Sequence, residues 1–367
     1  MTAHPLTLDL AAIGGAFDLP GTFIAAERYG SGHINDTYAA RFRHADVERR
    51  YILQRINPQV FRDAGAVMEN VDRVLAHLRS KLANHPDAAR RALTLVPTRN
   101  GERAFRDSDG ATWRCYHFIG GASSHDILTR PDQARQAAAA FGAFQRQLLD
   151  LPGPRLRETL PDFHNTPRRL DALARAVADD RVGRARACGR EIDFALARST
   201  LAGELVKRHA AGLLPERITH NDTKLNNVLL DDVTGEGLCV IDLDTVMPGL
   251  ALYDFGDMVR TAVSAAPEDA DDLDAITVRM PFYAALVEGY LSSAGSFLTR
   301  DERACLALSG RLITYEIGLR FLTDHLQGDV YFQIHRPAHN LIRARAQFRL
   351  VEAIEARLDE MNALAKA

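Results

Sequence analysis

The chain has 367 residues, a length that usually means two packed lobes or domains rather than one core. Its 46% hydrophobic and 25% charged residues exclude extensive disorder, and its net charge of -3 gives no general reason to bind nucleic acid or an anionic membrane. No apolar run reaches the roughly 18–20 residues of a membrane span, and the isolated cysteines argue against a zinc site or a disulfide framework, so we expect a protein of the reducing cytoplasm.

The first third of the chain, from about Thr22 to Ile119, has the pattern of a β-rich segment with one helix inside it. Val67–Leu82 carries apolar residues at helical spacing and is predicted to be that helix. Asn-Gly and Asp-Gly turn signals separate the last extended pieces. The predicted strands are Phe23–Tyr29, Thr37–Phe42, Tyr51–Ile56, Leu93–Pro97, Arg103–Asp107 and Trp113–Phe118.

Gly120-Gly121 ends this pattern, and the rest of the chain is mainly helical apart from a β-like island at Val228–Ile241. Pro131–Leu149 has proline in its first turn and apolar residues on one face. Further helices are predicted at about 168–180, 190–210, 275–293, 301–326 and 339–363. The predicted fold is therefore α+β, with a small β-rich lobe over residues 1–119, a hinge at about 113–121, and a larger, mainly helical lobe over residues 122–367.

The stretch Thr219–Leu230 contains His-x-Asp-x-Lys-x-x-Asn, the spacing of the catalytic loop in the protein-kinase-like superfamily. Phosphoryl transfer needs a carboxylate that orients the attacking hydroxyl and accepts its proton, and cations that neutralise the spreading negative charge. We predict Asp222 to be this catalytic base and Lys224 to reach the γ-phosphate of ATP. Asn227 is predicted to give Mg²⁺ a neutral oxygen ligand.

A second Mg²⁺ ligand is predicted from the hairpin that follows Asn227. If Val228–Leu230 and Leu238–Ile241 are its strands and the turn is centred near Thr234–Gly235, Asp242 lies opposite Asn227. Cross-strand neighbours have Cβ atoms about 4.5–5.5 Å apart, so an Asn and an Asp paired in this way can share one Mg²⁺.

Asp254-Phe255-Gly256 has the letters of the metal-binding triplet of protein kinases, but it lies beyond the turn at Pro248-Gly249. Asp242 follows the second hairpin strand directly, and we therefore prefer it as the metal ligand. Asp254 and Asp257 are expected to cap a helix and to support the catalytic loop.

The loop Tyr29–Asn35 lies between two predicted strands and is expected to cover the phosphates of ATP, because glycine lets backbone N–H groups approach phosphate oxygens. The lysine expected on the following strand is absent. Gln54 stands where that lysine would point into the cleft. Because glutamine brings no charge, Lys224 and the metal must neutralise more of the negative charge of the phosphates. The partner of Gln54 on the helix is left open between Glu69 and Asp72.

The segment Trp113–Ile119 is the candidate hinge, whose backbone would read adenine. With the loop and strand positions above, it completes the predicted nucleotide contacts. These are Gly30, Gly32, His33, Ile34, Asn35, Gln54, Tyr116 and Phe118.

Through His220–Asn227 and Ile241–Asp244, the sequence resembles the aminoglycoside phosphotransferase and choline kinase group. It is more similar to the N-acetylhexosamine 1-kinases, a family of bacterial anomeric sugar kinases, and this similarity runs along most of the chain. The similar segments are Gly32–Asn35, Tyr51–Gln54, Thr219–Asn227, Ile241–Thr245, Met247–Gly249, Asp254–Asp257 and Arg320–Leu322.

This resemblance implies phosphorylation by ATP and Mg²⁺ of the 1-hydroxyl of N-acetylglucosamine or N-acetylgalactosamine, giving the sugar 1-phosphate. The base and the metal ligands keep the roles argued above, and Asp222, Arg320 and Tyr331 contact the sugar. The family also has glutamine where kinases usually carry lysine, so Gln54 agrees with the resemblance.

The alternatives concern the acceptor and whether the chain is catalytic. An aminoglycoside, a choline-like molecule or N-acetylmuramate could replace the hexosamine, but cationic acceptors need surplus carboxylates or aromatic cages. The candidate segment Glu316–Tyr331 mixes Arg, Asp, His and Tyr, which suits a neutral polyol. A non-catalytic kinase-like binding module would be expected to lose Asp222, Asn227 or Asp242, and all three are present. A protein kinase is disfavoured because no obvious activation segment follows Asp257.

Overall fold

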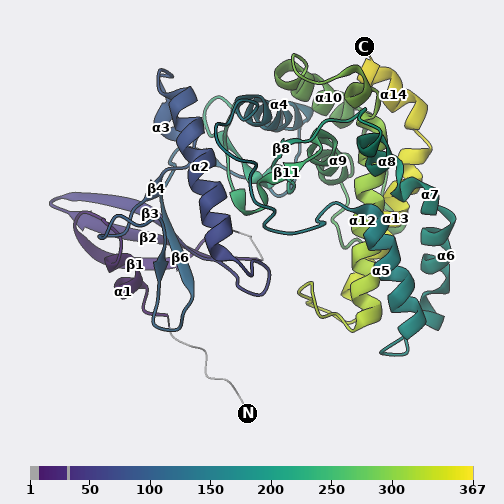
Figure 1. Cartoon of the computed structure of the whole chain (residues 1–367), viewed down its shortest axis with the longest axis horizontal. Helices are drawn as coiled ribbons and strands as arrows, with labels where there is room; N and C mark the ends of the chain where they lie inside the picture. Colours follow the sequence, from purple (N-terminus) through teal and green to yellow (C-terminus); the bar gives the residue numbers. More distant parts are fainter. Residues whose placement is uncertain (1–7, 31–33, 367) are drawn as a thin grey trace. The chain divides into compact units, whose positions relative to one another are not determined.

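The computed structural model describes residues 8–30 and 34–366, and the chain divides into two compact units, Met1–Gly121 and Ala122–Ala367 (Figure 1). The first unit contains an antiparallel sheet and the second is mainly helical, so the α+β class predicted from the sequence is confirmed. Within the described ranges, the chain has no helix that combines the length and the apolar character of a membrane span.

The first unit is built on an antiparallel sheet with the strand order β1-β2-β3-β6-β4, to which β5 is added beside β6. Because side chains alternate along a strand, one face of the sheet carries the core, which includes Tyr38, Phe42, Tyr51, Leu53 and Trp113. The strands are β1 (Thr22–Arg28), β2 (Asp36–His44), β3 (Val47–Arg55), β4 (Leu95–Val96), β5 (Phe105–Arg106) and β6 (Thr112–His117).

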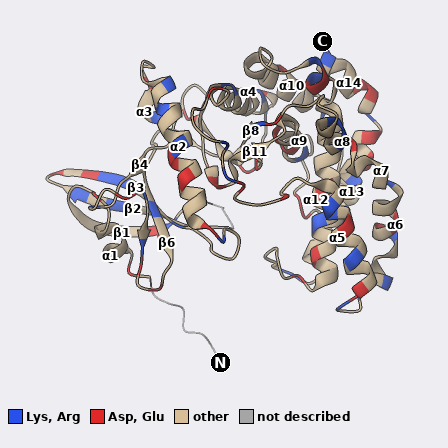
Figure 2. Cartoon of the chain, in the orientation of Figure 1, with Lys and Arg blue, Asp and Glu red and all other residues tan. Residues whose placement is uncertain are grey.

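The hairpin of β2 and β3 extends further than the predicted strands, because residues 41–50 are mostly charged and give little hydrophobic signal. Arg41 on β2 and Glu48 on β3 pair across the strands, with 3.2 Å between Nη1 and Oε1. Figure 2 shows basic and acidic residues side by side along this part of the sheet. Cross-strand charge pairs therefore extend the strands where apolar alternation ends.

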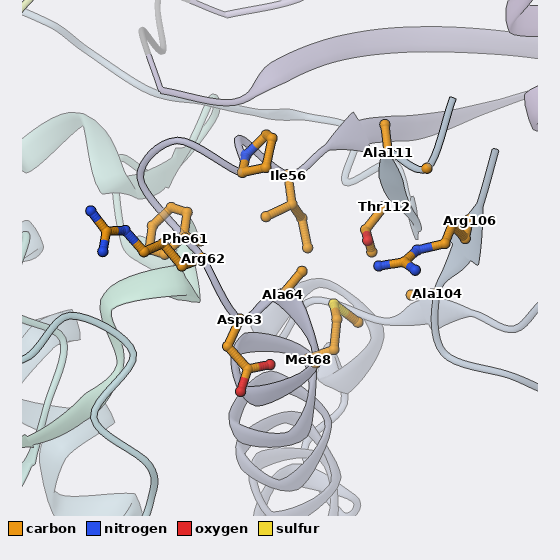
Figure 3. Close-up of a pocket in the computed structure, with 13 residues that line it drawn as sticks. Ile56, Phe61, Arg62, Asp63, Ala64, Met68, Ala104, Arg106, Ala111 and Thr112 are labelled. Atoms are coloured by element: carbon orange, nitrogen blue, oxygen red, sulfur yellow. The ribbon is translucent and has the colours of Figure 1, made fainter. Parts of the chain in front are cut away.

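Helix α2 (Ala64–Leu82) begins three residues before the predicted helix, because the Asp63 carboxylate caps it by accepting the N–H of Ala66, with 2.9 Å between Oδ1 and N. A cavity of about 360 Å³ lies between the start of α2 and the β5–β6 pair (Figure 3). Ile56, Phe61 and Met68 form its apolar wall. Two short helices of this unit, α1 (Leu10–Gly15) and α3 (Ala88–Arg91), were not predicted.

The second unit is organised around α12, which packs against α5, α9 and α13. Three predicted helices are split: 190–210 contains α6, α7 and α8, 301–326 breaks at Cys305, and 339–363 breaks after Glu355. Hydrophobic spacing shows which residues face the core but not where a helix is interrupted. The helices are α4 (Pro131–Gln147), α5 (Thr166–Asp179), α6 (Gly189–Ala197), α7 (Ser199–Ala202), α8 (Glu204–Ala210), α9 (Ala251–Ala262), α10 (Met280–Ala294), α11 (Arg300–Ala304), α12 (Leu306–Gln327), α13 (His339–Glu355) and α14 (Leu358–Lys366).

Short strands of the second unit hold both ends of the predicted catalytic loop. β9 and β10 form the predicted hairpin, and β7 pairs with the other edge of β9. β8, just before the loop, pairs with β11, and neither of these two strands was predicted. The strands are β7 (Ala122–Ser123), β8 (Arg217–Thr219), β9 (Val228–Asp231), β10 (Gly237–Val240) and β11 (Met247–Gly249).

Candidate active site

A buried carboxylate of α9 fixes the backbone of the loop between β8 and β9. Asp254 accepts the N–H of His220 at 2.9 Å through Oδ2 and the N–H of Asn221 at 2.7 Å through Oδ1. Gln145 of α4 donates its Nε2–H to Oδ2 at 2.6 Å. The expected support of the loop by Asp254 is confirmed, but helix capping is wrong, because the N-cap position of α9 is Leu250.

Asp254 is fully buried, and burial raises the pKa of its carboxyl against the opposing effect of these hydrogen bonds. Both of its oxygens are occupied by N–H donors, which argues against a metal at this carboxylate. Asp257, one turn further along α9, accepts the Nε–H of Arg260 at 2.8 Å and does not cap the helix either.

The His220 side chain ties the loop to the end of β10. The N–H of Asp222 donates to His220 Nδ1 at 3.3 Å, so Nε2 carries the ring proton and donates it to the carbonyl of Ile241 at 2.8 Å. The backbone is left-handed at Asn221, with φ 65°, and at Asp242, with φ 58°. Non-glycine residues hold this conformation at a cost in free energy, and only where their surroundings fix it.

Three of the predicted catalytic and metal residues lie together on this loop. Lys224 Nζ is 3.3 Å from Asp222 Oδ1. Asn227 Nδ2 lies 2.8 Å from the backbone carbonyl oxygen of Asp222 and 3.4 Å from its Oδ2. Burial alone would raise the pKa of Asp222, but the positive charges around it, chiefly Lys224, hold that pKa below its usual value. The carboxylate is therefore ionised at neutral pH, and with 26% of its side chain exposed it can receive a proton from outside.

The hairpin argument for Asp242 was wrong by one residue. The strands pair Val228 with Val240, and the N–H of Ile241 donates to the carbonyl of Asn227 at 2.9 Å, so Asn227 lies opposite Ile241 rather than Asp242. Gly237 pairs with Leu230, which centres the turn near Val233–Thr234 rather than Thr234–Gly235, and the pairing is irregular between Gly237 and Cys239. Asp242 comes next along the chain, where the backbone leaves the strand in the left-handed conformation.

The donor set of Asn227 and Asp242 fits Mg²⁺ in its chemistry. Asn227 directs its amide hydrogens to Asp222, so its carbonyl oxygen Oδ1 faces away from that carboxylate. An amide oxygen and a carboxylate are the hard ligands that Mg²⁺ prefers, and it commonly takes only one or two from a protein beside substrate phosphates. Residues 8–30 and 34–366 contain no group of three or more His, Cys, Asp or Glu that could hold a metal by themselves.

The predicted acceptor residues Arg320 and Tyr331 also lie together. The Arg320 guanidinium carbon is 5.8 Å from the ring centre of Tyr331, 5.1 Å from that of Phe163 and 5.4 Å from that of Phe332. Tyr331 is 53% exposed, and its N–H donates to the buried Asp324 carboxylate at 2.8 Å. Cation–π contacts and this carboxylate therefore fix the loop that carries Tyr331 against α12.

One functional contact was missed by sequence reasoning: a buried pair of His164 and Glu316 that connects α12 to the catalytic loop. His164 Nδ1 lies 2.8 Å from Glu316 Oε1, and Nε2 lies 2.9 Å from the backbone carbonyl oxygen of Asn221. Burial would lower the pKa of His164, but the Glu316 carboxylate raises it. Both ring nitrogens face acceptors, so the ring is an imidazolium. Arg320, predicted to contact the acceptor, stands one helical turn from Glu316 and is thereby linked to the loop.

Of the predicted phosphate loop, Gly32 and His33 lie outside the described residues. Gly30 has φ 79°, a conformation that glycine adopts at little cost. Asn35 accepts the N–H of Asn57 at 2.9 Å through Oδ1, and the side chain of Asn57 donates to the carbonyl of Ile34 at 3.0 Å. Asn35 therefore connects the end of the loop to the chain beyond β3.

The Gln54 side chain forms hydrogen bonds with Thr37 of β2 and with Arg114 of β6. Among the described residues, these are the contacts seen for Gln54, and neither involves the acidic candidates on α2. Asp72 of α2 pairs with Arg103, with 3.0 Å between Oδ1 and Nε. Arg114 could not be predicted from sequence patterns, because the pairing of β3 with β6 brings it to Gln54 from 60 residues away.

Most of the segment predicted as the hinge belongs to strand β6. Tyr116 pairs with Ile52 on one side and with Leu95 on the other, so its backbone belongs to the sheet, and the residue is buried. Phe118 follows the strand, and its ring lies 5.5 Å from that of Tyr29 and 3.7 Å below the guanidinium carbon of Arg50.

Comparison with known proteins places this arrangement in a family. The model of the phosphotransferase enzyme family matches residues 25–304. Similar solved structures include an aminoglycoside phosphotransferase from Alicyclobacillus acidocaldarius, with a TM-score of 0.63 and 14% identity over 100% of this chain and 98% of that chain. A microcompartment-associated aminopropanol kinase has a TM-score of 0.60 and 17% identity, covering 96% and 98% of the two chains. A spectinomycin phosphotransferase in complex with ADP and spectinomycin has a TM-score of 0.50 and 12% identity, covering 91% and 94%. At these low identities the TM-scores show a shared fold. The family model spans most of the chain and shows that this protein belongs to the phosphotransferase enzyme family.

Proposed function

We propose that this protein is a small-molecule kinase that transfers the γ-phosphate of ATP to an acceptor hydroxyl, with Asp222 as the catalytic base. The observation that carries the proposal is that Lys224 Nζ and Asn227 Nδ2 both lie within 3.4 Å of oxygen atoms of Asp222, on a loop fixed by Asp254. A loop built only for structure would not need an ionised carboxylate, a lysine and an asparagine gathered at one point.

In the proposed reaction, the Asp222 carboxylate accepts the proton of the acceptor hydroxyl while the hydroxyl oxygen bonds to the γ-phosphorus and ADP leaves. Asn227 holds the carboxylate through its Nδ2–H. Lys224 lies next to the carboxylate and brings positive charge toward the transferring phosphoryl group. Asn227 Oδ1 and Asp242 would hold Mg²⁺, which when bound neutralises charge on the phosphates.

We propose an N-acetylhexosamine as the acceptor, phosphorylated on its anomeric hydroxyl. Charge on the acceptor side supports a neutral molecule. The carboxylates near Arg320 are engaged by the protein itself: Asp162 pairs with Arg168, Glu316 with His164, and Asp324 with backbone N–H groups. Arg320 already occupies the aromatic surround of Phe163, Tyr331 and Phe332, which a cationic acceptor would otherwise need.

This charge distribution disfavours amino alcohols and aminoglycosides, although the solved neighbours include kinases of both kinds. N-acetylmuramate is the second candidate, because its carboxylate could pair with the Arg320 guanidinium. An ionised Asp222 beside Lys224 argues for a catalytic role and against a non-catalytic one.

The test is a product analysis by ³¹P and ¹H NMR after incubation of the protein with ATP and Mg²⁺. The panel contains N-acetylglucosamine, N-acetylgalactosamine, N-acetylmuramate, aminopropanol, choline and an aminoglycoside. We expect phosphorus coupled to the anomeric proton of the two hexosamines. Phosphate on O6 or O3, or on a cationic acceptor with the hexosamines untouched, would contradict the acceptor but leave the kinase assignment in place.

A further inference from the structure

A row of three polar side chains crosses the sheet of the first unit at the position where a lysine was expected. Thr37 of β2 lies opposite Gln54 of β3, and Gln54 lies opposite Arg114 of β6. Arg114 is 1% exposed, and its guanidinium donates to Gln54 Oε1 from Nε at 2.9 Å and from Nη2 at 2.6 Å. A positive charge is therefore present at this place in the sheet, supplied by the neighbouring strand.

The arrangement fixes which way the Gln54 amide points. A guanidinium has donors only, so the amide atom that faces Arg114 must be the carbonyl oxygen. The amide nitrogen then lies on the opposite side, where one of its hydrogens is donated to Thr37 Oγ1 at 2.9 Å. The second hydrogen of Nε2 remains as a donor whose direction Arg114 and Thr37 determine together.

We propose that Gln54 and Arg114 act as one phosphate-binding unit in place of the missing lysine. Arg114 supplies the buried positive charge and polarises the amide, and Gln54 presents the oriented N–H to a phosphate oxygen of the nucleotide. This inference rests on the proposed ATP-dependent function, and it adds a source of positive charge to those expected at Lys224 and the metal. A buried arginine cannot give up its charge, so the Arg114 guanidinium keeps the Gln54 amide in this orientation at every physiological pH.

The decisive variant is Gln54→Glu, which keeps the shape of the side chain. If Gln54 only satisfies the buried guanidinium, a carboxylate should do so better, and the variant should be at least as stable as the wild type with unchanged nucleotide affinity. If the unit binds phosphate, the variant removes the N–H donor of Gln54 and sets a carboxylate against the phosphate oxygen. The Kd for ATP should then rise by about 10- to 100-fold, as expected for the loss of a charge-assisted hydrogen bond.

The measurements are isothermal titration calorimetry with ATP, ADP and adenosine, and thermal unfolding without ligand. Adenosine has no phosphate, so its Kd should stay within about twofold of wild type in Gln54→Glu, which separates lost phosphate binding from a damaged fold. The matched control is Asn100→Asp, which makes the same amide-to-carboxylate change at an exposed turn of the same unit. It should leave all three Kd values unchanged.

Arg114→Met can fail to fold, because it leaves Gln54 Oε1 without its donor in the sheet interior, so a second variant is included. Gln54→Lys with Arg114→Met places the charge on β3 instead and should recover part of the ATP affinity lost in Gln54→Glu. A Gln54→Glu protein with wild-type Kd for ATP would overturn the phosphate-binding unit alone. A wild-type protein that binds no ATP would overturn the kinase function itself, so the two failures are distinguishable.

Discussion

The buried pair of His164 and Glu316 predicts a pH-dependent stability that one substitution should remove. The side chains of His164 and Glu316 are 3% and 0% exposed, with 2.8 Å between Nδ1 and Oε1. Glu316 also accepts a hydrogen bond from Thr166 at 2.5 Å. Removing one partner of a buried ion pair leaves the other charge uncompensated, so Glu316→Gln should lower the free energy of unfolding by about 3–5 kcal/mol near pH 6.

The sign of the pH effect follows from the pKa of His164, which is raised above its unfolded value of about 6.5. The stability due to this pair is therefore fully present below about pH 6.5 and is lost as the pH rises through the folded pKa, with a limiting slope of about 1.4 kcal/mol per pH unit. The lowered pKa of Glu316 works in the other direction and costs stability only when the pH falls below about 4.5. The deficit of Glu316→Gln should consequently shrink between pH 6 and pH 9.

The assay is urea unfolding of wild type and variant at several pH values across this range. Glu302→Gln is the matched control: Glu302 is also buried, with 2.8 Å between its Oε1 and Arg217 Nε, but an arginine keeps its charge throughout the range. Glu302→Gln should be destabilised by an amount that does not change with pH. A pH dependence in Glu316→Gln equal to that of wild type would refute the assignment of an imidazolium at His164.

The remaining predictions concern the catalytic groups. Asp222→Asn should lower kcat by about 10²–10⁴-fold, the usual contribution of a general base, while the Kd for ADP measured by calorimetry stays near wild type. Asp242→Asn should raise the Mg²⁺ concentration needed for half-maximal activity. Asp254→Asn should lower thermal stability and kcat without changing that Mg²⁺ concentration. The reverse pattern would show that the wrong aspartate was chosen as metal ligand. Arg320→Ala should raise KM for the hexosamine far more than KM for ATP in steady-state assays, and equal effects would remove Arg320 from the acceptor site.

Residues that act close together along the chain were predictable from the sequence. The spacing of Asp222, Lys224 and Asn227 is a property of one short loop, and the structure brings their polar atoms together as that spacing suggests. The α+β class was predictable for a similar reason, because strand and helix periodicities are local. The roles of these residues in catalysis stay predictions until the variants are measured.

Tertiary structure decided the contacts that join distant segments. Arg114 reaches Gln54 across 60 residues because β6 inserts beside β3, and His164 reaches Glu316 across 152 residues because α12 crosses the second unit. The hairpin shows the same limit on a small scale: its turn was misplaced, and Asp242 lies one residue beyond the partner of Asn227. Strand pairing and helix packing are set by burial across the whole unit. The role of a buried charged side chain such as Arg114 or Glu316 can therefore be interpreted only when its partner is known.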